Sequence, residues 1–315
     1  MSFSDHALGF ALSLAGASEN WASINFCRAG TSVQVRVHDS NLPAVVQQLG
    51  HLVWELESEC QITFIEYSDE IRFPFAIDAE YSESTFMDFR FVSFLNVVVV
   101  SDRRDCSHYV IYRDPPPFSS DYLRVIFQLL VPSTSHPVHG GSVSWGSSAV
   151  LLSNVGGSGK SSLIASAILI GASTTGDDFG LFQLGAQGAT VWSQFSTFKL
   201  AESSPASRTV LAPAIHKSND KNVYELEKLR PGSAVPSHLV NQIMIPYLGE
   251  TFAINAISPT QAFRQIAPSS SGLALDRQST NLAISELCQK LPAFNLVLSP
   301  DTQRNAEMLR EAIYR

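Results

Sequence analysis

The sequence predicts an α/β protein in two parts, a smaller α+β domain over residues 1–132 and a larger α/β domain over residues 133–315. Two patterns lead to this division. Up to about residue 130, short apolar or alternating runs typical of strands are interrupted by two helical patterns. From about residue 135 the order becomes strand, glycine-rich loop, helix and strand, which is typical of nucleotide-binding α/β units.

The composition is that of a globular protein, with 45% hydrophobic and 16% charged residues and a net charge of -8. Without a Lys/Arg cluster, this charge argues against non-specific nucleic-acid binding, which needs several cations facing phosphates. The four cysteines are scattered and form no C-x-x-C pair, so they indicate neither a zinc site nor a disulfide framework. We expect buried free thiols in a reducing compartment.

No membrane segment is expected. The N-terminal run "ALGFALSLAGA" is apolar, but no Lys or Arg precedes it and the first basic residue is Arg28, so we assign it to the fold and not to a signal segment. No other stretch reaches the roughly 18 uncharged apolar residues of a spanning helix. The sequence therefore predicts a soluble, cytoplasmic protein.

In the first part, "SVQVRVHD" alternates valine with polar residues and predicts a half-buried strand. From Asn41, apolar residues recur at three- and four-residue steps up to Leu56 and predict a helix with Asn41 as its cap. "QITFIEY", "FPFAIDA", "FLNVVVVSD" and "SHYVIYRD" then predict strands, the last two joined by a polar turn. The triple proline of "RDPPPFSSD" ends this sheet, and Ser119 or Ser120 caps a helix that ends near Pro132.

In the second part, "SVSWG" and "SAVLLSN" predict a hairpin, and "GKSSLIASAILIG" predicts a helix that stops at Gly171. Ser258-Pro259 opens a short helix. "NLAISELCQKL", "FNLVLS" and "PDTQRNAEMLREAIYR" predict a helix, a strand and a final helix. The segment from about 200 to 257 is rich in Ser, Pro and Ala where it begins, and it looks loop-like. It is expected to be either a lid or substrate clamp, or an ordinary surface excursion.

The stretch "NVGGSGKSS" predicts a phosphate-binding loop. Such a loop converges backbone N–H groups and a helix N-terminus on phosphate oxygens, while a lysine reaches the outer phosphates and a hydroxyl holds Mg²⁺. Lys160 and Ser161 take those last two roles, so the predicted ligands are ATP and Mg²⁺. The predicted nucleotide-binding residues are Asn154, Val155, Gly156, Gly157, Ser158, Gly159, Lys160, Ser161 and Ser162.

Asn154 stands where the pattern G-x-x-x-x-G-K-[ST] has its first glycine. The position needs a tight turn out of a strand, where positive φ is often required, and asparagine tolerates left-handed geometry better than most residues. Asn154 is thus a candidate for positive φ at the strand-to-loop turn. On this basis Asn154→Gly is expected to leave nucleotide binding nearly intact.

Two further features flank the loop. Asp177-Asp178 begins 17 residues after Lys160, which fits a helix rising about 16 Å, a turn and a short returning strand. One carboxylate can hold Mg²⁺ with Ser161 while the other accepts the proton of an attacking hydroxyl. Upstream, His139 in "HPVHGGSV" starts the hairpin that carries the loop.

Together, His139-Gly140, the loop from Gly156 to Ser162, and Asp177-Asp178 resemble the catalytic domain of HPr kinase/phosphorylase, a bacterial P-loop protein-serine kinase related in fold to phosphoenolpyruvate carboxykinase. Close similarity covers residues 136–182, and the terminal "FNLVLSPDTQRNAEMLREAI" resembles the ending of HPr-kinase-related proteins. The glutamate-arginine-glycine signature linked to dephosphorylating activity is absent from the sequence. The part before residue 133 does not resemble that family.

The resemblance implies an ATP-dependent kinase without phosphorylase activity, acting on a hydroxyl, with a serine of a peptide or protein as the leading acceptor. Some relatives are peptide-tailoring kinases, for example in lasso-peptide biosynthesis. It implies Asp177 as base, Asp178 with Ser161 at the metal, Lys160 on the β- and γ-phosphates, and His139 on the transferring group. The reverse division between the two aspartates stays open. Acceptor recognition is expected in the first part and in the segment from about 200 to 257.

Other functions remain open on the sequence. They are an ATP-sensing module without phosphoryl transfer, a kinase of a small-molecule hydroxyl, and NTP hydrolysis coupled to movement. Arg264 and Arg208 are candidates for a positive charge near the γ-phosphate. HPr kinase/phosphorylase is hexameric, so by analogy a homo-oligomer is also open.

Overall fold

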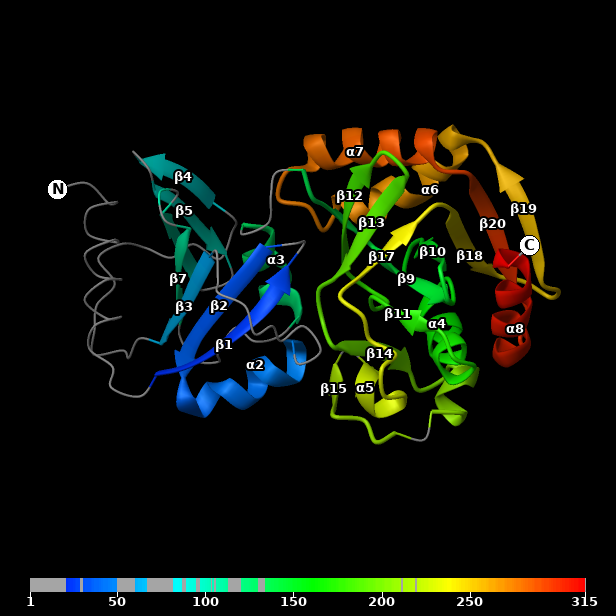
Figure 1. Ribbon diagram of the computed structural model, residues 1–315, viewed down its shortest axis with the longest axis horizontal. Helices are drawn as coiled ribbons and strands as arrows, with labels where there is room; N and C mark the ends of the chain where they lie inside the picture. Colours follow the sequence, from blue (N-terminus) through cyan, green and yellow to red (C-terminus); the bar gives the residue numbers. More distant parts are fainter. Residues whose placement is uncertain are drawn as a thin grey trace. The chain divides into compact units, whose positions relative to one another are not determined.

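The computed structural model is a mixed α/β structure with parallel strand pairs in two of its sheets (Figure 1). The chain divides into two compact units, Met1–Leu130 and Val131–Arg315. The structure describes residues 21–28, 31–49, 60–66, 82–86, 89–94, 97–102, 104, 106–112, 120–129, 134–210, 212–218 and 220–314. The predicted N-terminal element and the predicted strand "FPFAIDA" lie outside these ranges.

The first unit contains a seven-stranded sheet in the order β1-β2-β3-β7-β6-β5-β4. Its β2–β3 and β3–β7 pairs are parallel and the others antiparallel. The bounds are β1 Trp21–Arg28, β2 Thr31–His38, β3 Cys60–Glu66, β4 Ser82–Phe86, β5 Phe89–Phe94, β6 Val97–Asp102, β7 Ser107–Tyr112, η1 Asp39–Asn41, α2 Leu42–Leu49 and α3 Ser120–Gln128.

Several predictions for this unit are confirmed. Val33, Val35 and Val37 are fully buried on one face of β2, as their alternation predicts. β6 and β7 form the predicted hairpin. The predicted helix after Asn41 begins at Leu42, although the residues after Leu49 in that prediction lie outside the described ranges. β1, β4 and β5 were not predicted.

The second unit is built on a six-stranded sheet in the order β11-β9-β10-β18-β20-β19. The β10–β18 and β18–β20 pairs are parallel, whereas β9 is antiparallel to β10 and β11, and β19 is antiparallel to β20. Four strands, β11, β10, β18 and β20, therefore run in one direction. The bounds are β9 Gly140–Trp145, β10 Ser148–Ser153, β11 Ser173–Thr174, β18 Ile243–Leu248, β19 Ala253–Ile257 and β20 Ala293–Leu298.

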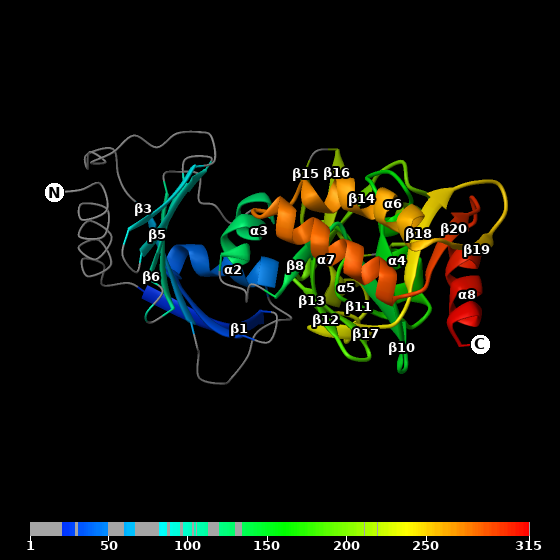
Figure 2. The ribbon, with the colours of Figure 1, turned by 90° about the horizontal axis from the view of Figure 1, so that it is seen from above.

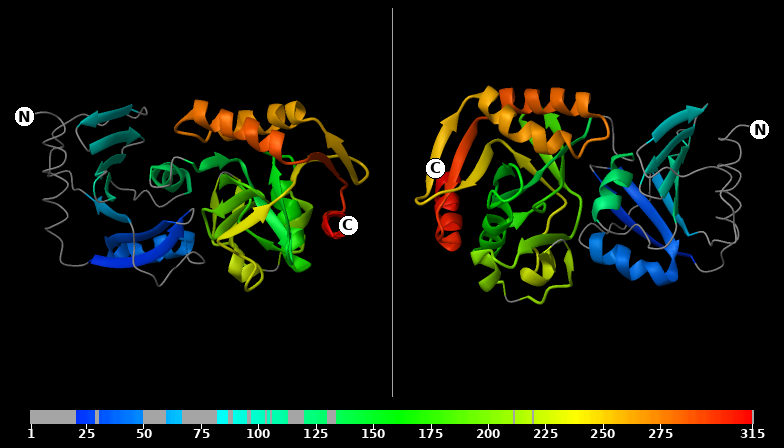
Figure 3. Two further views of the ribbon diagram at one scale, coloured as in Figure 1. Left: turned by 45° about the horizontal axis from the view of Figure 1, so that its top comes forward. Right: turned by 180° about the vertical axis from the view of Figure 1, so that it is seen from behind.

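Successive side chains of a strand point to opposite faces of this sheet, and each face is covered by a hydrophobic core. Val150 and Leu152 of β10 pack in a core with α4 (Lys160–Leu169) and α8 (Thr302–Ile313). Leu151, between them, packs in a core with α6 (Pro259–Ser271) and α7 (Arg277–Lys290). Figure 2 shows α6 and α7 side by side, and they stay together in both views of Figure 3, coloured orange. The sheet is thus the middle layer of the unit.

Two smaller sheets complete this unit, one of four strands in the order β17-β13-β12-β8 and one of three in the order β14-β16-β15. The bounds are β8 His136–Val138, β12 Gly180–Gly185, β13 Gly188–Ser193, β17 Ser237–Val240, β14 Thr197–Ala201, β15 His216–Ser218, β16 Lys221–Glu225, η3 Pro205–Arg208 and α5 Leu226–Leu229. Expecting a loop over residues 200–257 was therefore wrong. The segment supplies most of the three-stranded sheet, and it also contains β17, β18 and β19.

Capping residues mark the ends of three helices, and two of them, Ser258 and Gly171, were predicted. Ser258 caps α6 in a reciprocal capping box with Gln261, and α6 runs for 13 residues, so it is longer than expected. Asp301 caps α8 through the N–H of Arg304. Gly171, with a φ of 101°, stops α4 as predicted, because this left-handed geometry favours glycine.

Candidate functional site

A cavity of about 490 Å³ lies where the parallel strands end. The phosphate-loop residues follow β10, Asp177-Asp178 follows β11, Leu248-Gly249 ends β18, and Leu298 to Pro300 ends β20. In α/β sheets ligands bind at the carboxyl ends of the strands, because the loops there converge above one edge of the sheet. This topology brings together segments up to about 140 residues apart in the sequence.

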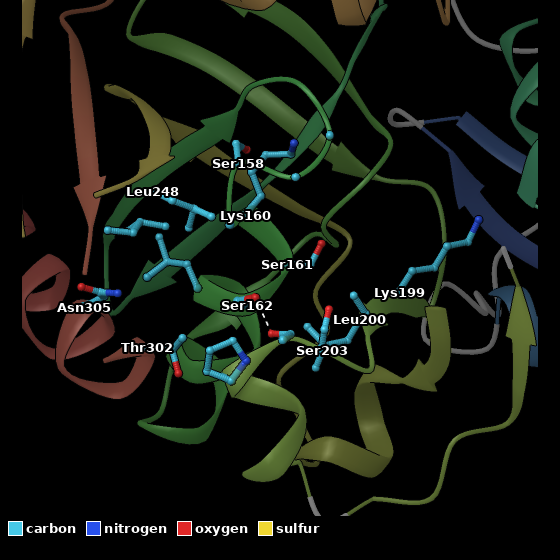
Figure 4. Close-up of a pocket in the computed structure, with 18 of the residues that line it drawn as sticks. Ser158, Lys160, Ser161, Ser162, Lys199, Leu200, Ser203, Leu248, Thr302 and Asn305 are labelled. Carbon is cyan, nitrogen blue, oxygen red and sulfur yellow. Dashed lines mark hydrogen bonds between the residues drawn. The ribbon is translucent and has the colours of Figure 1, made fainter. Parts of the chain in front are cut away.

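The phosphate loop has the geometry that its glycines predict. Gly157 and Gly159 have φ values of 79° and 92°, and Gly159 leads directly into α4. Residues 156–163 line the cavity, with Lys160 and Ser161 beside it in Figure 4. The first turn of α4 thus directs its N-terminal N–H groups toward the cavity, where they could bind an anion.

Lys160 is 5% exposed, and its ammonium group is held by the loop itself. Its Nζ donates to the carbonyl oxygens of Asn154 at 2.6 Å and Val155 at 3.0 Å. Burial lowers the pKa of Lys160 to about 8, against an opposing effect of the carboxylates of Asp177 and Asp178. A polyphosphate in the cavity would favour the charged form and so raise this pKa.

Asn154 differs from its predicted geometry. Among the described non-glycine residues, positive φ occurs at Cys106 and Asp220 and not at Asn154, so the expectation of left-handed backbone is wrong. The side chain instead acts as a link. Its Nδ2 donates to the carbonyl of Pro246 in β18 at 2.8 Å, and its Oδ1 accepts from the N–H of Val155 at 2.7 Å. Asn154 is buried, and its bond to Pro246 is shielded from water, whereas the bond to Val155 is only partly buried.

Asp177 is 4% exposed and contacts Ser161 of the phosphate loop. Burial and the neighbouring Asp178 raise the pKa of Asp177 to about 6, whereas hydrogen bonds from the Ser161 hydroxyl and the Lys199 N–H act in the opposite direction. Its Oδ2 is buried without a hydrogen-bond partner among the described residues. A buried carboxylate oxygen of this kind calls for a compensating ligand, since native structures rarely leave such a group unsatisfied.

This arrangement fits a divalent cation. The unpartnered Oδ2 of Asp177 and the hydroxyl of Ser161 are oxygen donors of the kind Mg²⁺ prefers. Within the described ranges, no group of three His, Cys, Asp or Glu side chains forms a self-sufficient metal site. Mg²⁺ in phosphate sites usually takes one or two protein ligands and draws the others from water and substrate phosphates.

Asp178 lies on the open side of the pair. Its Oδ1 is 3.0 Å from Nε2 of His139, its side chain is 52% exposed, and both residues line the cavity. The hydrogen bond from His139 is the main cause that lowers the pKa of Asp178 to about 2. A molecule entering the cavity therefore meets Asp178, whereas Asp177 is not among the lining residues.

The glycines beside His139 explain why these groups meet. A Cβ on Gly140 would lie 2.1 Å from the Leu152 carbonyl oxygen, and one on Gly141 would lie 1.8 Å from the Gly176 carbonyl oxygen. Only glycine allows these close approaches. Gly141 thus lets the turn before Asp177 lie against β9, at whose start His139 stands. Gly141 was not singled out in the sequence.

A buried network supports the same turn and was missed. Nδ1 of His238 is 2.8 Å from the Ser142 hydroxyl, and its Nε2 is 2.9 Å from the Ser173 hydroxyl. The Ser142 hydroxyl is in turn 2.8 Å from Oγ1 of Thr175, and Oγ1 of Thr174 donates to the Ser142 carbonyl at 2.8 Å. The bonds join β9, β11 and β17 behind the aspartates. A lone histidine in an apparently loop-like segment gave no signal of this role.

Burial lowers the pKa of His238 to about 4, so its ring is neutral near neutral pH. A neutral imidazole offers one donor and one acceptor, which matches the two hydroxyl partners because a hydroxyl can fill either role. The ring therefore completes the network without burying a charge.

The cations that line the cavity differ from the two arginines expected near the γ-phosphate. Arg264 lies in α6 and Arg208 at the end of η3, and neither is among the residues that line the cavity. Lys199 and Lys221 do line it, and both help to lower the pKa of Asp178. In Figure 4 Lys199 lies on one side of the phosphate loop and Leu248 on the other.

No helix in the described part of the chain is long and apolar enough to span a bilayer. No protein-family model matches the chain, and no curated protein does. Among solved structures, the chain is similar to the Hpr(Ser) kinase/phosphatase from Coxiella burnetii, with 13% sequence identity and a TM-score of 0.32. The match covers 57% of this chain and 88% of that one.

Proposed function

We propose that the chain is an ATP-dependent kinase that transfers the γ-phosphate to a hydroxyl group, with a catalytic domain of the HPr kinase and phosphoenolpyruvate carboxykinase type in its second unit. The observation that carries this proposal is the grouping of two different carboxylates beside one phosphate loop. Asp177 lies beside the Ser161 hydroxyl of the loop, and Asp178 is hydrogen-bonded to His139 at the cavity.

The proposal assigns nucleotide binding to the loop and the start of α4. The amides around Gly157 and Gly159 and the helix N-terminus supply N–H groups and positive potential for phosphate oxygens. Lys160 would exchange its two carbonyl acceptors for the outer phosphates of ATP. These contacts also offset the negative charge that develops on the leaving diphosphate.

The environments of the two aspartates support the reverse of the division implied by the resemblance. Asp177, with its contact to Ser161 and its unpartnered Oδ2, would hold Mg²⁺. When bound, Mg²⁺ neutralises phosphate charge and aligns the phosphates for transfer. Asp178, which lines the cavity, would receive the acceptor hydroxyl, and His139 would keep its carboxylate oriented.

In the transfer step the acceptor O–H donates a hydrogen bond to Asp178 as its oxygen approaches the γ-phosphorus. The new O–P bond forms while the bond from the γ-phosphorus to the bridging oxygen breaks, and ADP leaves with the electron pair. The proton of the hydroxyl passes to Asp178. Because the pKa of Asp178 is low, at about 2, this proton moves late, when the partly bonded oxygen has become acidic.

We further propose a serine of a peptide or protein as the acceptor. Support comes from the sequence motifs alone, and a small-molecule hydroxyl is the second candidate. The proposal includes kinase activity without phosphorylase activity, because the glutamate-arginine-glycine signature is absent from the sequence.

The test is to incubate the purified protein with Mg·ATP and a serine-containing peptide library, and to look by mass spectrometry for products heavier by one phosphate. Lys160→Ala should abolish the product. Lys217→Ala is the matched control, because Lys217 is exposed and pairs with Glu202 at the surface. Full transfer by Lys160→Ala would refute the mechanism. Tight ATP binding without any product would favour the sensing module, and phosphate release without an acceptor would favour hydrolysis.

Metal dependence separates the two aspartates. Asp177→Asn should raise the Mg²⁺ concentration needed for half-maximal binding of a fluorescent ATP analogue, because it removes an anionic ligand. Asp178→Asn should leave this concentration nearly unchanged and lower kcat. The opposite pattern would restore the division in which Asp178 serves the metal and Asp177 is the base.

A further inference from the structure

Two lysines face the cavity from the three-stranded sheet, on strands that the sequence did not reveal. Lys199 lies on β14 and Lys221 on β16. In the antiparallel register Lys199 is opposite Val223, and Ala201 is opposite Lys221. Lys199 and Lys221 are therefore diagonal neighbours on the same face of the sheet, where Cβ atoms lie about 7–8 Å apart or slightly less.

Both lysines are close to the carboxylate that would receive the acceptor. They line the same cavity as Asp178 and His139, and each contributes to the low pKa of Asp178. The main-chain N–H of Lys199 bonds to Asp177, which fixes this end of β14 at the site. The two ammonium groups thus belong to the catalytic edge of the cavity.

Two further lysines of this region form ion pairs with acidic side chains. Lys217 on β15 pairs with Glu202, and Lys228 in α5 pairs with Glu225 at 2.7 Å. Lys221, in contrast, makes no ion pair or side-chain hydrogen bond within the described ranges. Two like charges that face one cavity repel each other, so an anion between them would be favoured.

The charges of the cavity fall into two groups. Lys160 and the amides of the loop can serve the phosphates of a nucleotide from one side. In Figure 4 the side chain of Lys199 extends away from that loop and from Lys160. Lys199 is therefore better situated for a second, separate anion than for the inner phosphates, and Lys221 is its diagonal neighbour on the same sheet face.

We infer that Lys199 and Lys221 form a subsite for carboxylate groups of the acceptor, so that the protein prefers an acidic peptide in which Asp or Glu flanks the reacting serine. The inference rests on the proposed kinase function and deepens it by naming the acceptor class. The peptide would approach over β14 and β16, with its hydroxyl at Asp178 and its carboxylates at the two lysines. The net charge of -8 would repel such a peptide elsewhere on the surface, which makes this local positive site more selective.

The test compares two labelled pentapeptides, Asp-Asp-Ser-Asp-Asp and Asn-Asn-Ser-Asn-Asn, which differ only in charge. Their binding is measured by fluorescence anisotropy on the full chain with a non-hydrolysable ATP analogue and Mg²⁺. The acidic peptide should bind at least about tenfold more tightly, and Lys199→Gln or Lys221→Gln should each reduce this preference by roughly three- to fivefold. Added salt should reduce it as well.

Lys217→Gln is the matched control, because Lys217 lies on the same small sheet and is already paired with Glu202. It should keep the full preference for the acidic peptide. Binding of the ATP analogue should change less than about twofold in Lys199→Gln and Lys221→Gln. A large loss of nucleotide affinity with an unchanged peptide preference would assign the lysines to the nucleotide phosphates and overturn the inference.

The two proposals can fail separately. Equal binding of the acidic and neutral peptides overturns the acidic subsite, even if γ-phosphate is transferred to both. Charge-dependent peptide binding that needs Lys199 and Lys221, without transfer from ATP, supports the anionic subsite and contradicts the kinase function.

Discussion

Replacing Asp177 with asparagine should stabilise the free protein above about pH 6 while impairing its function. Asp177 is buried, and its pKa is raised from 3.8 to about 6, chiefly by burial and also by Asp178. The charged form of Asp177 is thus disfavoured in the free protein. Functional sites often carry such a cost in stability.

The sign and size of this change in the free energy of unfolding follow from the linkage between proton binding and folding. A carboxyl group whose folded-state pKa is raised binds its proton more tightly in the folded state, so stability falls as pH rises from 3.8 through about 6. This rise of the pKa of Asp177 corresponds to about 3 kcal/mol at about pH 8 and about 1 kcal/mol at about pH 4.5. The substituted amide would be neutral throughout. The advantage of Asp177→Asn over the wild type should therefore grow by about 2 kcal/mol between these pH values.

The assay is urea unfolding followed by intrinsic fluorescence at both pH values, with the transition of the second unit recognised by its shift on adding Mg·ADP. Any fixed cost of the new amide cancels between the two pH values. Asp178→Asn is the control with the opposite sign, since the pKa of Asp178 is lowered to about 2 by His139, and its effect should be smaller because the side chain is half exposed. An advantage of Asp177→Asn that is independent of pH, or that shrinks toward pH 8, would refute the reasoning.

Three further substitutions test residues that hold the loop and the turn before Asp177 in place. The loop pattern alone predicts that Asn154→Gly leaves nucleotide binding nearly intact, but the substitution removes two hydrogen bonds and should lower the free energy of unfolding by about 1–3 kcal/mol and weaken ATP binding, measured by urea unfolding and calorimetry. Gly141→Ala should abolish transfer and destabilise the fold by about 1–3 kcal/mol, whereas Gly185→Ala, with ordinary space for a Cβ, should do neither. His238→Ala should lower the free energy of unfolding at pH 7 and should flatten the loss of stability that the wild type shows as pH falls from 6.5 toward 4, because a ring of depressed pKa must be protonated there.

The motifs were visible in the sequence because they are local. Each one depends on residue types within a few positions, and the spacing between Lys160 and Asp177 is set by one helix and one short strand. The parts that were missed depend on pairing between distant strands. Lys199 and Lys221 reach the cavity only through the register of β14 and β16, and His238 reaches its partners only through β17. Strands of so few residues show no periodic pattern from which their pairing partners could be predicted.

β18 was missed for a different physical reason. It is a buried strand between β10 and β20, yet it contains Pro246, a residue that usually argues against a central strand. The parallel register with β10 pairs Leu151 with Ile243 and Leu152 with Met244. Pro246 therefore lies beyond these pairs, near the point where the chain leaves β10 for the phosphate loop. On that side its missing N–H breaks no bond of the ladder.

The same proline accounts for the asparagine in the phosphate loop. Beyond the ladder, the Pro246 carbonyl needs a donor from the loop side, and Nδ2 of Asn154 supplies it at 2.8 Å. A glycine at position 154 could make the turn but would leave that buried carbonyl without this donor. Asn154 also accepts from the Val155 N–H and offers its own carbonyl to Lys160, so one residue ties the loop, the lysine and β18 together. The hydrogen bonds of the Asn154 side chain therefore hold the start of the loop against β18, which a glycine at this position could not do.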